Sequence, residues 1–163
     1  MLTERAKPNS PAQILIVWDD DKDMIRMFTY VLEKDGHVVQ SATSWDEGLT
    51  TCLRQPPDLM IVHRLLDEQN KGLEFCKQVR SEAALPNFPI IVGWADIGAS
   101  NWKDGYQQAF DAGANACFGR VFDIADVIEQ VWILLDNPSV TNLVDRQTLV
   151  LSLKTKVETI AKK

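Results

Sequence analysis

Residues 58–68 read "DLMIVHRLLDE". The consecutive apolar residues 59–62 are typical of a short strand that is buried on both faces, and this strand ends at His63. In α/β proteins, binding and chemistry gather where parallel strands end. The role of His63 therefore depends on what the other segments place beside it.

The same pattern of short apolar runs followed by helical spacing repeats along the chain. Alternation of this kind predicts a parallel sheet with helices on both faces. We expect strands at 13–18, 35–40, 58–63, 88–94 and 114–119. We expect helices at 23–34, 45–55 and 73–81, then one that ends near 112, and a last one at 124–135 with Asp123 as its N-cap.

Composition favours a cytoplasmic protein with one domain. The chain has 163 residues, of which 45% are hydrophobic, and this is enough for one ordinary core. The polar N-terminal segment has no apolar stretch of the secretory type, and no apolar run is long enough for a membrane span. Three widely separated cysteines without CxxC spacing fit a reducing compartment and argue against a zinc site.

Charge and spacing divide the chain into three segments. Residues 1–12 are expected to be a flexible lead-in, 13–137 the folded domain, and 138–163 an amphipathic helical extension. Residues 139–163 carry a net charge of +3, which leaves −9 for residues 1–138. Such an acidic body is not expected to bind nucleic acid. The extension could dock on the body, pair with a second copy or meet an anionic membrane; we expect docking or a homodimer rather than membrane contact.

Four segments resemble the response-regulator receiver domain of two-component signalling, in an atypical form. They are "ILIVWDDDKDMIR", "PPDLMIVHRLLDEQNKGLEFCKQVR", "FPIIVGWAD" and "GANACFGRVFD", and the resemblance spans residues 13 to about 136. It implies a flavodoxin-like (βα)5 doubly wound sheet of order 2-1-3-4-5. In that family an acidic pair after the first strand holds Mg²⁺, and an Asp that ends the third strand accepts a phosphoryl group.

The match at the family's reacting residues is partial. The acidic pair falls on Asp19 and Asp20, but the acceptor falls on His63. The position of the family's Thr or Ser falls on Trp94, that of its Lys on Arg120 and that of its switch aromatic on Cys117. The resemblance therefore implies a degenerate phosphoacceptor pocket. An imidazole removes both the nucleophile and an oxygen ligand for Mg²⁺, so no cofactor is expected and Mg²⁺ binding should be weak or lost.

Each of these residues has an alternative interpretation. His63 could bind a metal with Asp20 or Glu68, or become phosphorylated, but we expect a hydrogen bond to Asp20 instead. Asp19 and Asp20 could keep a cation or be neutralised by Arg120. Trp18 and Trp94 could form a recognition patch or plug the vacated space. Cys117 could be redox-active, although a buried core residue is expected.

The expected function is that of a pseudo-receiver: a non-enzymatic signalling module that contacts a protein partner without phosphorylation. One rival is a receiver that uses a displaced acceptor, Asp67 or Glu68. Another is a phosphatase of the haloacid-dehalogenase type, with Asp19 as the nucleophile and Asp21 as the acid/base, but the later motifs of that family are missing. A flavin site is not expected, because no phosphate loop follows the first strand.

Overall fold

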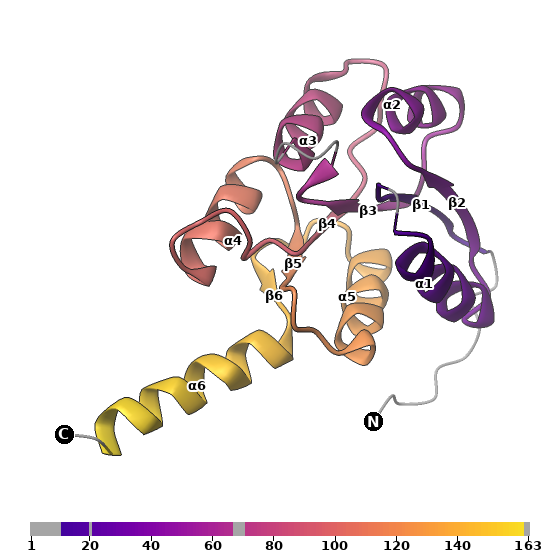
Figure 1. The fold of residues 1–163 in the computed structure, drawn as a ribbon. Helices are drawn as coiled ribbons and strands as arrows, with labels where there is room; N and C mark the ends of the chain where they lie inside the picture. Colours follow the sequence, from indigo (N-terminus) through magenta and orange to yellow (C-terminus); the bar gives the residue numbers. More distant parts are fainter. Residues whose placement is uncertain (1–10, 20, 67–70, 162–163) are drawn as a thin grey trace.

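The computed structural model describes residues 11–19, 21–66 and 71–161. Its centre is a parallel sheet in the order β2-β1-β3-β4-β5-β6 (Figure 1). The predicted order of the first five strands is confirmed, and a sixth strand joins the edge beside β5. The strands are β1 (Gln13–Val17), β2 (Val38–Ala42), β3 (Leu59–His63), β4 (Ile90–Gly93), β5 (Ala116–Phe118) and β6 (Leu143–Val144).

Helices cover both faces of the sheet, as the apolar strands require. One core cluster combines α2, α3 and α4 with strand residues such as Leu15 and Val17, and the other combines α1 and α5 with Ile14 and Ile16. The fold is therefore doubly wound, because successive strand residues point to opposite helical layers. The helices are α1 (Lys22–Lys34), α2 (Trp45–Arg54), α3 (Gly72–Ser81), α4 (Trp102–Asp111), α5 (Ile124–Asp136) and α6 (Arg146–Ala161). None of the helices in the described ranges is long and apolar enough to cross a membrane.

Short polar side chains fix where three of the helices begin. The side chain of Ser44 accepts a hydrogen bond from the Glu47 amide, and Asn101 accepts one from Asp104. The predicted cap at Asp123 is confirmed, because its carboxylate accepts the Ala125 amide at 2.9 Å. Each cap satisfies a backbone donor that has no partner inside its own helix.

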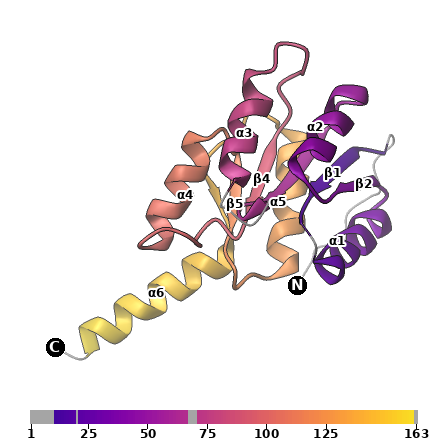
Figure 2. The ribbon, with the colours of Figure 1, turned by 45° about the horizontal axis from the view of Figure 1, so that its top comes forward.

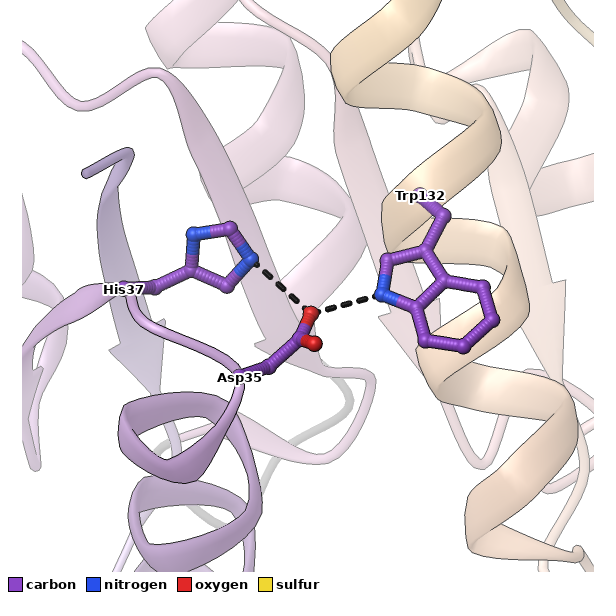
Figure 3. A network of polar contacts seen from close by, with 3 residues as sticks. All are labelled: Asp35, His37 and Trp132. Carbon is purple, nitrogen blue, oxygen red and sulfur yellow. Dashed lines mark hydrogen bonds and ion pairs between the residues drawn. The ribbon is translucent and has the colours of Figure 1, made fainter. Parts of the chain in front are cut away.

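A polar network at the opposite end of the sheet from His63 ties the first βα unit to α5. The Asp35 carboxylate accepts a hydrogen bond from the Trp132 indole at 2.6 Å and lies 3.2 Å from Nε2 of His37 (Figure 3). Asp35 follows α1 and His37 precedes β2, whereas Trp132 lies on α5. The sequence alone indicated no role for Trp132, and the structure places it as a cross-link between distant segments.

The segment after residue 137 contains a strand as well as the expected helix. Leu143 and Val144 pair in parallel with Ala116 and Cys117 of β5, and α6 begins two residues later. Two residues are too few for hydrophobic periodicity to reveal a strand. From β6, α6 extends away from the rest of the molecule in both views (Figures 1 and 2).

Candidate functional site

The carboxyl ends of β1, β3 and β4 meet around His63. The Nδ1 atom of His63 lies 2.7 Å from Oδ1 of Asp19, which follows β1. We expected this hydrogen bond to go to Asp20; the structure places it on Asp19, and Asp20 lies outside the described residues. His63 is buried, with 6% of its surface exposed, so the edge of the sheet carries a histidine that is almost covered.

Two indole rings cover the imidazole. The Trp18 ring stacks on it with centroids 4.2 Å apart and an angle of 13° between the planes, and the Trp94 ring meets it edge-on at 4.6 Å. Gly93 makes this packing possible, because a Cβ there would lie 2.6 Å from the Trp18 ring. Trp18 and Trp94 therefore fill the space beside His63.

Burial and the Asp19 contact together define the protonation state of His63. Burial lowers the pKa of His63, and this effect outweighs the hydrogen bond and charge of Asp19, which raise it. The ring is therefore neutral near pH 7. A carboxylate can only accept, so Nδ1 carries the proton and Nε2 has the free lone pair. Nε2 is itself buried and has no hydrogen-bond partner within the described part of the chain.

The backbone at Trp94 adopts a conformation that bulky residues rarely take. Its φ is 55°, in the left-handed region, where a large side chain is strained by about 1–3 kcal/mol. Strain of this size persists only where surrounding contacts hold it. Here the contacts are the two rings that the Trp94 indole meets, those of Trp18 and His63.

The structure does not bring Arg120 and Cys117 to the imidazole. Arg120 is exposed, and its backbone amide donates to Asp96 at 2.9 Å. Within the described residues no ion pair joins Arg120 to Asp19, and the alternative pairing of Arg120 with Asp20 lies outside those residues. Cys117 lies on β5 in the core beneath α4, where burial raises its thiol pKa well above the usual range. Cys117 is thus a buried core residue, as expected.

Arg64, which the sequence analysis did not single out, is one of the largest buried side chains. Its guanidinium donates to the carbonyl of Ala95 at 2.9 Å and to that of Gly105 at 3.0 Å, and it also binds the Gln108 side chain. Gly105 and Gln108 belong to α4, so the residue next to His63 is bonded to that helix. An arginine just after an apolar strand gives no sequence signal of such a role, because most arginines are exposed.

The described carboxylates at this site already make contacts within the protein, and Asp20 lies outside the described residues. Mg²⁺ takes hard oxygen ligands in octahedral geometry. Asp19 is already hydrogen-bonded to His63, and the carboxylate of Asp21 accepts the Met24 amide at 3.0 Å as the cap of α1. The group at the centre is an imidazole nitrogen, which suits zinc or copper better. No cluster of three or more potential metal ligands occurs in residues 11–19, 21–66 and 71–161.

Comparisons with curated proteins find transcriptional regulatory proteins and response regulators. The chain is 31% identical over 78 residues to the alkaline phosphatase synthesis transcriptional regulatory protein PhoP of Bacillus subtilis, a match that covers 48% of this chain and 31% of that protein. It is 25% identical over 134 residues to the transcriptional regulatory protein ResD of the same organism, covering 82% of this chain and 52% of ResD. The chain thus spans a third to a half of these relatives.

Solved structures agree with the fold. A putative response regulator from Chloroflexus aurantiacus is 30% identical, with a TM-score of 0.68, and the match covers 78% of this chain and 100% of that one. A LuxR-family response regulator from Aurantimonas has a TM-score of 0.71 at 19% identity, covering 91% of this chain and 99% of that one, which supports the fold alone. The family model for the response regulator receiver domain matches residues 14–131. The chain therefore belongs to the response regulator receiver domain family.

Proposed function

We propose that this chain is a pseudo-receiver: a cytoplasmic, non-enzymatic module of phosphorelay-type signalling that binds a protein partner without being phosphorylated. The observation that carries the proposal is the packing of His63. A neutral imidazole stands where the family places its acceptor, and the indoles of Trp18 and Trp94 enclose it. A buried ring with no carboxylate of its own offers neither the usual nucleophile nor room for a phosphoryl group.

The charge stabilisation that phosphoryl transfer needs is also weak at this site. Such transfer relies on positioned cations and hydrogen-bond donors around the phosphoryl oxygens. Trp94 stands in place of a hydroxyl, and Arg120 is exposed and bound through its backbone to Asp96. An imidazole at the centre of the site supplies no hard oxygen ligand, so we propose that no cofactor is required.

The signalling surface in this proposal lies around α4 and α5. Arg64 bonds to α4 from within the core, which favours one fixed position of that helix over two alternating ones. The partner is a signalling protein, and the acidic body disfavours nucleic acid. A second copy of the chain is a further partner, contacted through α6.

Two rival functions predict different chemistry. The displaced acceptors Asp67 and Glu68 lie outside the described residues. A phosphatase would need Asp19 as the nucleophile and Asp21 as the acid/base. However, one oxygen of Asp19 is hydrogen-bonded to His63 and one oxygen of Asp21 caps α1, so both carboxylates already have structural contacts.

Incubation with acetyl phosphate followed by intact-mass and peptide mass spectrometry tests the proposal. We expect no stoichiometric phosphate on the wild type. His63→Asp alone should also remain unmodified, because Trp94 still fills the adjacent space. A combined His63→Asp, Trp94→Thr and Arg120→Lys variant serves as the positive control for a restored pocket. Stoichiometric phosphate on the wild type, at Asp67, Glu68 or any other carboxylate, would overturn the pseudo-receiver proposal.

A further inference from the structure

Helix α6 has an inner and an outer face of different character. Five residues of α6 line a groove of about 330 Å³ together with residues of the body: Thr148, Leu151, Ser152, Thr155 and Lys156 from the helix, and Asp96, Trp102 and Val121 from the body. On the outer side, five apolar residues lie within about 100° of arc at 3.6 residues per turn. We call these the outer stripe: Leu149 (44% exposed), Val150 (44%), Leu153 (61%), Val157 (65%) and Ile160 (70%). The stripe therefore faces away from the body and is not covered by it.

Buried hydrogen bonds hold the start of α6 in one direction. The Tyr106 hydroxyl on α4 donates to Asp145 at 2.6 Å and lies 2.9 Å from the Thr148 hydroxyl, and Asp145 also accepts the Thr148 amide at 3.1 Å. Arg146 pairs with Glu129 of α5 at 2.6 Å. These contacts nucleate the helix, so a partner meets an already formed α6 and the cost of helix initiation is avoided.

We propose that the outer stripe pairs with the same stripe of a second copy, as a parallel two-stranded coiled coil. The stripe follows the 3-4-3 spacing of a heptad, with Val150 and Val157 at a positions and Leu153 and Ile160 at d positions. β-branched residues at a with Leu at d, as at Leu153, favour two parallel strands, and sedimentation separates this state from the higher oligomers that Ile at d, as at Ile160, favours. The heptad does not extend backwards, because Arg146 occupies the preceding d position and is engaged with Glu129.

The lysines beside the stripe select the parallel orientation. In a parallel pair, a g position faces the e position of the partner's next heptad. Leu149 then faces Lys154, and Lys156 faces Ala161, so no lysine meets another lysine. An antiparallel pair sets e against e and g against g, which brings lysine against lysine. The inner face of α6 points toward its own body, so the two bodies lie on opposite outer sides of the coil.

The exposed area of the stripe predicts a weak dimer. Five partly exposed aliphatic side chains supply on the order of 300–400 Å² per copy. The resulting total is below the roughly 1,200 Å² of a standard stable interface. We therefore expect concentration-dependent pairing in the range of about 10 µM to 1 mM. This inference rests only on the self-association part of the proposed function, and phosphate acceptance at His63 is read separately by mass spectrometry.

Sedimentation equilibrium of the full chain tests the pairing. Leu153→Glu combined with Val157→Glu should weaken association at least about tenfold, while circular dichroism shows a folded body. The matched control, Thr155→Glu with Thr159→Glu, adds the same charge on the other side of α6 and should change association less than about twofold. A wild type that remains monomeric at about 1 mM, or equal losses in both variants, would overturn the proposal.

Cross-linking tests the orientation. Ile160→Cys places two thiols together only in a parallel, in-register pair, so it should form a disulfide dimer under mild oxidation, whereas Thr159→Cys should not. The three native cysteines are buried, and burial raises the pKa of Cys52 to about 11 and that of Cys76 to about 12, so they should not interfere. Equal cross-linking of both variants contradicts the register.

Stripe-dependent binding to phosphatidylglycerol vesicles by a chain that does not self-associate would assign the stripe to a membrane surface and refute the dimer.

Discussion

Tyr106→Phe removes one hydroxyl from the buried network that joins α4 to α6. Asp145 is 1% exposed, and the phenol of Tyr106 is its shortest hydrogen bond, at 2.6 Å; the Thr148 hydroxyl and amide remain at 2.9 and 3.1 Å. A hydrogen bond to a charged group contributes about 1.5–3 kcal/mol. We expect Tyr106→Phe to lower the free energy of unfolding by that amount at pH 7. With an m-value of about 2 kcal/mol/M, the urea midpoint should fall by about 1 M.

The loss of unfolding free energy in Tyr106→Phe should depend on pH, and the direction of that dependence follows from the pKa of Asp145. Burial raises the pKa of Asp145, and the bond from Tyr106 opposes that rise. Removing the hydroxyl raises the folded-state pKa further, so the folded variant binds more protons than the folded wild type while the unfolded chains are alike. The variant's deficit therefore grows as the pH rises. It should shrink to about 0.5–1.5 kcal/mol at acid pH, where the carboxyl is neutral.

Urea titrations at pH 5 and pH 7, with amide exchange of α6, measure both effects. Tyr30→Phe is the matched control, because Tyr30 is 64% exposed and should lose less than about 0.5 kcal/mol. Amides in the first turns of α6 should exchange faster in Tyr106→Phe and not in the control. A deficit no larger than that of Tyr30→Phe, or one that grows toward acid pH, would refute the assigned role of the network.

Three further substitutions test individual contacts. His63→Phe keeps a ring beside the indoles but removes the titrating group. Because burial lowers the pKa of His63, the wild type should lose stability as the pH falls below about 6.5, and the melting temperature of the variant should fall less between pH 7 and pH 5. An equal fall in melting temperature for both proteins would contradict this. Gly93→Ala puts a methyl group 2.6 Å from the Trp18 ring, so it should lower the free energy of unfolding by about 1–3 kcal/mol and alter the tryptophan fluorescence. An unchanged emission spectrum and melting temperature would show that the Trp18 indole is not confined there. Trp132→Phe removes the indole N–H that donates to Asp35 at 2.6 Å, so it should lower the free energy of unfolding in urea by about 1–2 kcal/mol. An unchanged free energy of unfolding would mean that solvent replaces the indole.

The elements of this fold were largely predictable because apolar periodicity defines them. β3 was expected over 58–63 and spans Leu59–His63, and the last helix of the body was expected from Ile124 with Asp123 as its cap. β6 was not predictable, since its two residues carry no period and pair only because the chain returns along β5. Secondary structure follows local pattern, whereas this edge strand follows from tertiary pairing.

The site was only partly predictable for a related reason. Proximity of Asp19, His63 and Trp94 follows from parallel strands ending at one edge, and the structure brings them together. Which carboxylate reaches the imidazole depends on the path of the chain after β1, and hydrophobic pattern contains no information about it. The place of Arg120 likewise depends on Asp96, which captures the Arg120 amide in the loop after β5.

Two of the polar groups that sequence reasoning missed, Arg64 and Asp145, share one physical property: both are buried and bonded to α4. Arg64 reaches the carbonyl of Gly105 from beside His63, and Asp145 reaches the hydroxyl of Tyr106 from the start of α6. A buried charge is tolerated only when hydrogen bonds replace its hydration, so both groups restrict where α4 can lie. Gly105 and Tyr106 are neighbours on α4, so a shift of this helix would have to break bonds on two sides, toward the residue next to His63 and toward the start of α6. We therefore expect a partner that displaces α4 to disturb the contacts at the start of α6 as well.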